Sequence, residues 1–211
     1  MRLQERETPA RVSRLCVEEQ DIRGEPPARL RWMAQTLFMI RRFEEALLDL
    51  KGQYATIRDQ VMAAIAEVRE SQQCIGGPKV TELAKQVAAV SDCQYAVGVS
   101  SGTDALLNCL MSLEIGPGDE VITTPFTFVA STTCIMMTGA TPVFVDIDPV
   151  SLNIDPQGIE AAITDQTKAV LPVEVFGNPA GFDQVCEIAE RHGLPVVEDS
   201  CEALGSALNG R

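Results

Sequence analysis

The sequence lacks several features that identify common functional classes. No apolar run approaches the length of a membrane-spanning helix, and the charged start MRLQERETPARVSRLCVEEQ contains no apolar segment of signal-peptide length. The seven cysteines are scattered without a C-x-x-C pair, and neither a G-x-G-x-x-G nor a G-K-[ST] motif is present. We therefore expect a cytoplasmic protein with no membrane anchor, no metal site and neither a Rossmann nor a P-loop nucleotide site.

Basic residues are scarce in the second part of the chain. The sequence has 17 Lys and Arg against 30 Asp and Glu, and only Lys168, Arg191 and Arg211 follow position 86. Because binding to nucleic acid requires clustered Lys and Arg, we expect no nucleic-acid partner. An anionic ligand held by this part would depend on backbone N–H groups and helix ends.

The first ninety residues have helical spacing. Apolar residues recur every three or four positions over residues 28–50, which predicts a long amphipathic helix. Two further helices are predicted over residues 55–70 and 79–90, separated by the turn-prone stretch CIGGPKV.

From Tyr95 onward, short apolar runs alternate with helical patterns. The predicted strands are YAVGVS, EVITTPF, TPVFVDI, TKAVLPVEVF and LPVVED. The predicted helices are DALLNCLMSL, TFVASTTCIMMTG, PQGIEAAI and GFDQVCEIAERHG. This alternation predicts an α/β domain with a mainly parallel sheet and helices on both faces, in which ligands bind at the carboxyl ends of the strands.

Three motifs stand at these strand ends, and each has a structural alternative. The stretch SSGT, residues 100–103, precedes a helix and suits a phosphate, although a simple capping box of Ser101 and Asp104 explains it at least as well. In ITTPFTFVASTTC, Phe126 or Phe128 could stack on a planar ring or pack in the core. Asp199, after the strand LPVVE, could hold a protonated ring nitrogen or cap a helix.

Taken together and in this order, the three motifs resemble one family. The stretch from SSGTDALLNCLMSLEIGPGDE to LPVVEDSCEALGSALNGR closely resembles the DegT/DnrJ/EryC1/StrS family of pyridoxal-phosphate (PLP) dependent sugar aminotransferases, and the resemblance covers about residues 48–211. It implies the large domain of the aspartate aminotransferase fold (PLP fold type I), preceded by N-terminal helices.

The resemblance also implies the site. Gly102 and Thr103 match the residues that hold the PLP phosphate, Phe128 matches the aromatic stacked on the ring, and Asp199 matches the partner of the pyridine nitrogen. Glu202 stands where many members have glutamine near the ring hydroxyl. The implied substrates are a nucleotide-linked keto sugar and glutamate or glutamine as amino donor, and the implied assembly is a homodimer, because fold-type-I enzymes build each active site from two subunits.

One catalytic element of the family has no match. The lysine that forms the Schiff base lies in an S-x-x-x-x-K segment downstream of the aspartate, and we expect it beyond Arg211. The sequence is therefore interpreted as the amino-terminal half of an aminotransferase that is inactive alone. The alternative is a non-catalytic remnant that binds PLP weakly or pairs with a complete protomer.

The start of the chain resembles a different family. MAQTLFMIRRFEEALLDL is similar to the first helix of the alpha subunit of thiamine-diphosphate dependent 2-oxoacid dehydrogenases, over about residues 30–48. No cofactor motif of that family follows. We therefore divide the chain into a helical, possibly fused extension (residues 1–47) and a partial PLP-dependent transferase domain (residues 48–211), and expect no thiamine chemistry.

Overall fold

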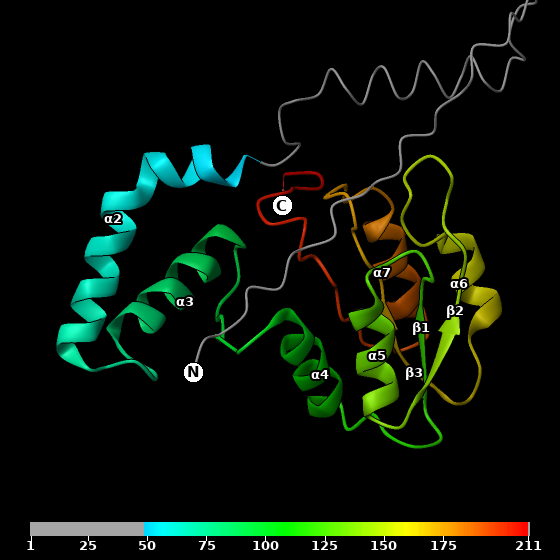
Figure 1. Ribbon diagram of the computed structural model, residues 1–211. Helices are drawn as coiled ribbons and strands as arrows, with labels where there is room; N and C mark the ends of the chain where they lie inside the picture. The colour runs from blue at the N-terminus through cyan, green and yellow to red at the C-terminus, as the bar shows by residue number, and fades with distance from the viewer. Residues whose placement is uncertain (1–48, 211) are drawn as a thin grey trace, which may run out of the picture. The chain divides into compact units, whose positions relative to one another are not determined.

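The computed structural model describes residues 49–210 (Figure 1). The helix predicted over residues 28–50 lies almost entirely outside this range, as does the dehydrogenase resemblance over residues 30–48. The chain divides into two units, residues 1–64 and 65–211. The described part of the first unit is the amino-terminal portion of α2. The boundary expected between residues 47 and 48 stays a prediction.

Helices α2 (Leu50–Ser71) and α3 (Pro78–Val90) confirm the two helices predicted before the sheet. α3 begins at Pro78, where a missing N–H is tolerated because the first helical N–H groups have no partner within the helix. None of the helices in residues 49–210 is long and apolar enough to cross a bilayer.

The sheet is parallel and has the order β2-β1-β3. Its strands are β1 (Glu120–Thr123), β2 (Thr141–Phe144) and β3 (Thr167–Leu171). The segment 196–199 lies parallel to β3 and its continuation, through the bridges Val170–Val196 and Val173–Asp199. Four of the five predicted strand segments thus enter a parallel arrangement, which confirms the predicted fold class.

Helices connect these strands in sequence. α5 joins β1 to β2, α6 joins β2 to β3, and α7 leads from β3 to the segment 196–199 (Figure 1). The bounds of the helices are α4 (Gly102–Ser112), α5 (Val129–Met137), α6 (Pro156–Ala162) and α7 (Phe182–Arg191). A helix between parallel strands is the connection that this geometry requires.

Strands β1 and β3 have buried residues on both faces, because neighbouring residues point to opposite sides of the sheet. On one side, which we call the α4/α5 face, buried strand residues pack against those two helices: Val121, Ala169 and Leu171 against Leu106, Leu110 and Ile135. On the other side, the α6/α7 face, the packed residues are Ile122 and Val170 with Ile159, Val185 and Ile188. Helices therefore cover both faces, as predicted.

The strand predicted for YAVGVS is wrong. Residues 95–99 have no regular secondary structure, and the side chains of Tyr95 and Val97 are 77% and 83% exposed. A β-strand is stabilised by backbone hydrogen bonds to a neighbour and by burial of alternate side chains. Within residues 49–210 this segment has neither, so its apolar alternation alone does not form a strand.

Candidate cofactor site

The five residues predicted for a PLP site line one cavity at the carboxyl end of the sheet. The cavity has a volume of about 380 Å³, within the range of roughly 300–1,000 Å³ that is typical of small-molecule sites. Gly102 and Thr103 come from the start of α4, Phe128 from the start of α5, and Asp199 and Glu202 from the end of the chain. The fold thus brings together residues that are far apart in the sequence.

The start of α4 presents backbone donors to this cavity. Ser101 is the N-cap, and its hydroxyl oxygen accepts a hydrogen bond from the Asp104 N–H at 3.1 Å while it donates to the Asp104 carboxylate at 2.9 Å. The N–H of Ala105 donates to the carbonyl of Ser101 at 3.0 Å. In the described residues, the N–H groups of Gly102 and Thr103 have no hydrogen-bond partner. The capping box and the anion site predicted as alternatives are therefore compatible.

Gly102 also allows two segments to approach closely. A Cβ atom at position 102 would lie 3.3 Å from the Sγ atom of Cys201, which is tighter than most van der Waals contacts. The Cys201 thiol is hydrogen-bonded to Asp199, and this bond, more than burial, raises the pKa of Cys201 to about 11. Cys201 is thus a neutral thiol at pH 7.

Asp199 is the buried acid of the cavity, with only 8% of its surface exposed. Its Oδ2 atom accepts a hydrogen bond from the Ser131 hydroxyl at 2.7 Å, and this hydroxyl lies 2.8 Å from the Thr127 hydroxyl. No ion pair to Asp199 is found within residues 49–210. A buried carboxylate held by a hydroxyl donor, with no protein cation beside it, favours a cationic group on a ligand.

The two aromatics that the sequence singled out have different surroundings. Phe126 packs against Phe176, with ring centroids 6.0 Å apart. Phe128 is the N-cap residue of α5, lines the cavity and is 75% exposed. Phe128 is therefore the residue whose ring can stack on a bound planar group.

Glu202 lies in the loop that follows Asp199 and is exposed. Its backbone packs against Gly177, which has φ +70°, and a Cβ atom at position 177 would lie only 2.7 Å from the Glu202 carbonyl oxygen. Only glycine fits this position without a shift of the backbone. The loop after β3 thus supports the loop that carries Glu202.

Ser131 and Thr127 were not found from the sequence. They lie one helical turn apart at the start of α5, and Ser131 is fully buried. The only signal is a small polar residue on the buried side of an apolar helix, which does not identify a partner that follows 68 residues later.

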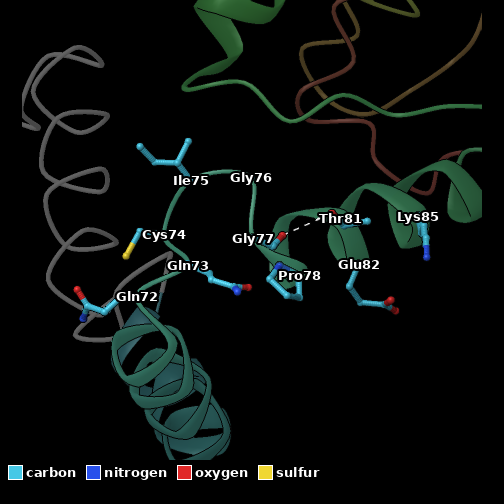
Figure 2. A pocket seen from close by; sticks show the side chains of 10 residues that line it. All are labelled: Gln72, Gln73, Cys74, Ile75, Gly76, Gly77, Pro78, Thr81, Glu82 and Lys85. Carbon is cyan, nitrogen blue, oxygen red and sulfur yellow. Dashed lines mark hydrogen bonds between the residues drawn. The ribbon is translucent and has the colours of Figure 1, made fainter.

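A larger and more open hollow lies between the end of α2 and the start of α3 (Figure 2). Polar side chains and the glycines of the CIGGPKV turn line it, and the Thr81 hydroxyl donates to the Gly77 carbonyl at 3.5 Å. Ile75 at its rim is 98% exposed. None of the predicted site residues lies there, so the strand-end cavity is the candidate cofactor site.

The DegT/DnrJ/EryC1/StrS aminotransferase family model matches residues 55–211. The chain belongs to this family. The match confirms the resemblance that the sequence motifs indicated over about residues 48–211. Aminotransferases of this family depend on PLP, and fold type I is the fold of the related structures.

Several relatives of the chain are named as sugar aminotransferases. It is 46% identical over 164 residues to UDP-2-acetamido-2-deoxy-3-oxo-D-glucuronate aminotransferase of Pseudomonas aeruginosa, which covers 78% of this chain and 46% of that protein. It is also similar to the crystal structure of DesV from S. venezuelae, with a TM-score of 0.77 and 44% identity over 79% of this chain and 45% of that one.

A third relative was solved with a form of the cofactor. The structure of NtdA from Bacillus subtilis with bound PMP has a TM-score of 0.68 and 35% identity, over 70% of this chain and 34% of that one. The chain spans less than half the length of these relatives.

The residues of the cavity fit PLP. Gly102 and Thr103 offer two unpaired N–H groups at a helix N-terminus for a phosphate, Phe128 offers an exposed ring, and Asp199 offers a buried carboxylate. These are the donor set, stacking face and counter-charge that a phosphorylated, protonated pyridine ring requires.

Proposed function

We propose that this chain forms the cofactor-binding part of a PLP-dependent aminotransferase that acts on a nucleotide-linked keto sugar. The observation that carries the proposal is the convergence of Gly102, Thr103, Phe128 and Asp199 on one cavity in a chain of this family. The substrate class is supported by relatives such as the P. aeruginosa enzyme, whose name states a 3-oxo sugar linked to UDP.

Each residue has a role that its surroundings support. The free N–H groups of Gly102 and Thr103 bind the phosphate with the help of the α4 dipole, which compensates for the scarcity of basic residues in this part of the chain. Phe128 stacks on the ring. Glu202, which stands where many members of the family have glutamine, lies at the ring hydroxyl.

Asp199 holds the protonated pyridine nitrogen. PLP supplies an electron sink for a carbanion, and a carboxylate beside that nitrogen maintains the protonated form on which the sink depends. Ser131 fixes the orientation of the Asp199 carboxylate through the 2.7 Å hydrogen bond.

The 211-residue polypeptide has no amine at this site. Its four lysines are Lys51, Lys79, Lys85 and Lys168, and none of them lines the cavity. Transamination requires an amine to carry the cofactor and transfer a proton. We therefore expect the polypeptide to bind PLP reversibly and to catalyse no transamination.

A titration of the polypeptide with PLP, followed by absorbance and circular dichroism, tests this proposal. We expect saturable binding that dialysis reverses, weaker binding of pyridoxal because it lacks the phosphate, and no single lysine modified stoichiometrically after borohydride treatment and peptide mapping. Absence of saturable binding would refute the cofactor site. Turnover of a keto sugar above the rate of free PLP would refute the assignment of the missing amine.

The homodimer is a second part of the proposal. Large apolar side chains at α5 are exposed, including Phe128, Val129, Met136 and Met137, each by at least 60%. A second copy would cover such a surface. We expect light scattering to give the mass of a dimer or a larger assembly, and a monodisperse monomer at high concentration would contradict this. The cytoplasmic location also stays a prediction.

A further inference from the structure

Glu174, which follows β3, is a buried acid with an unsatisfied oxygen. Its side chain is 2% exposed, and its Oε2 atom has no hydrogen-bond partner. The ion pairs found in residues 49–210 use other acids, Glu67, Glu70 and Glu160. A carboxylate this deeply buried without a cation would be strongly destabilising.

The alternation of the strand places a second acid beside Glu174. Val173 and Val197 belong to the core on the α4/α5 face, so the next residues, Glu174 and Glu198, lie on the opposite, α6/α7 face. Val196 packs into the core of that same face. In addition to burial, the charge of Glu198 acts on Glu174 across this face and raises the pKa of Glu174.

Two carboxylates are both acceptors, so a hydrogen bond between them requires a proton. Burial and then the charge of Glu198 raise the pKa of Glu174 to about 8. Burial also raises the pKa of Glu198. Glu174 is the more deeply buried of the two, and it is therefore the one that carries the proton at pH 7.

The other titratable groups around the pair add no positive charge. Asp199, on the opposite face, adds a further negative charge that acts on Glu174. From α7, the groups that interact with the pair or with its neighbours are Cys186 and Asp183. All of these favour the protonated form of Glu174.

The backbone connects this pair to the cofactor site. The N–H of Glu174 donates to the carbonyl of Asp199 at 3.2 Å, and the N–H of Asp199 donates to the carbonyl of Pro172 at 3.0 Å. We propose that Glu174 is a positioning residue whose carboxylic acid donates a hydrogen bond to Glu198 and so holds the strand end that carries Asp199. The proposal concerns the protein alone, so it does not depend on whether PLP binds.

The sign of the pH dependence follows from the direction of the shift. An unfolded Glu has a pKa near its ordinary value of 4.5, and the folded pKa is higher. Between these values the folded protein binds more protons than the unfolded chain, so the contribution of Glu174 is complete below pH 4.5 and is lost as the pH rises through about 8. The unfolding equilibrium constant then rises by up to about tenfold per pH unit in this window.

Urea unfolding of the 211-residue chain between pH 5 and 9.5 tests the proposal. Glu174→Gln keeps a neutral donor toward Glu198 at every pH, so we expect wild type to lose stability relative to this variant as the pH rises to about 8, and the difference to be constant above that. Glu187→Gln, an exposed change on α7, is the matched control and should follow wild type. Parallel curves for wild type and Glu174→Gln would overturn the proposal.

Two further measurements keep the test decisive if Glu174→Gln does not fold. Glu198→Gln removes the neighbouring charge and should shift the window to lower pH. Difference infrared spectra of wild type between pH 6.5 and 9.5 should show the loss of one carboxylic-acid C=O band, and its absence would overturn the proposal.

Hydrogen exchange near Asp199 distinguishes a positioning role of Glu174 from a general effect of Glu174 on stability. Quench-flow hydrogen exchange of a peptide that contains the Asp199 amide is compared between wild type and Glu174→Gln at the same pH, so that the intrinsic exchange rate cancels. We expect equal protection at pH 6 and several-fold lower protection in wild type at pH 9. Equal protection at both pH values would show that Glu174 does not hold the strand end.

Discussion

Asp199 and Glu174 lie on opposite faces of the same pair of strand segments, and both carboxyl groups are buried. Asp199, on the α4/α5 face, accepts a hydrogen bond from the Ser131 hydroxyl. Glu174, on the α6/α7 face, has an oxygen without a partner and faces another acid, Glu198. Both side chains are buried, 8% and 2% exposed, and they differ in the groups that contact them.

The difference shows how one sheet can place two buried acids in different surroundings. Asp199 accepts a hydrogen bond from a hydroxyl and has no ion pair within residues 49–210, which leaves it available to a cationic group of a ligand. Desolvation, and then a like charge, stabilise the neutral form, which makes Glu174 a donor. The side chains of the two acids lie on opposite faces of the sheet, although Glu174 also contributes to the wall of the cofactor cavity.

The largest expected effect on PLP binding comes from removing the carboxylate of Asp199, which lines the cofactor cavity. Asp199→Ala deletes the partner of the protonated nitrogen, and we expect PLP affinity to fall by about 1 to 3 kcal/mol, roughly 5- to 150-fold in Kd. Absorbance titration at pH 7 measures this change. Asp165→Ala is the control, because Asp165 is exposed and precedes β3 at the other end of the sheet.

An unchanged PLP affinity in Asp199→Ala would contradict the role that the family resemblance gives to Asp199. It would also remove the functional contrast between Asp199 and Glu174. Circular dichroism of the variant verifies that it is folded, since the change removes one of the two acceptors of the buried Ser131 hydroxyl and leaves the Phe128 carbonyl.

A smaller effect is expected from Ser131→Ala. The Asp199 carboxylate remains but loses one donor, and we expect PLP affinity to fall by about 1 kcal/mol, near fivefold. The same titration measures it. Ser112→Ala, which removes an exposed hydroxyl at the end of α4, is the matched control and should have wild-type affinity. A loss as large as that of Asp199→Ala would mean that Ser131 contacts the cofactor directly.

Much of the fold could be predicted from periodicity. The helical spacing of DALLNCLMSL and GFDQVCEIAERHG gave α4 and α7, and the apolar runs gave β1 to β3, because their side chains are buried against the elements that the pattern implies. Residues 95–99 show the limit of this reasoning. Alternation describes which side chains could be buried, but a strand also requires a neighbouring backbone, and the sequence of the segment carries no information about one.

The residues of the candidate site also fall into two groups, those that could be predicted from the sequence and those that could not. Gly102, Thr103, Phe128 and Asp199 were predicted because small, aromatic and acidic residues at strand ends are unusual enough to indicate a ligand. Ser131 and Glu174 were not, because their importance depends on a partner brought close only by the fold. A serine in a helix and a glutamate after a strand are ordinary in a sequence.

The glycine at position 177 limits how this site can diversify. Its backbone conformation and the 2.7 Å approach to the Glu202 carbonyl leave no room for a side chain, so the two loops can shift only together. In these two loops, substitutions that keep the backbone in place are therefore limited to the side chain at position 202. Such a substitution changes the chemistry at the cavity without shifting the backbone that lines it.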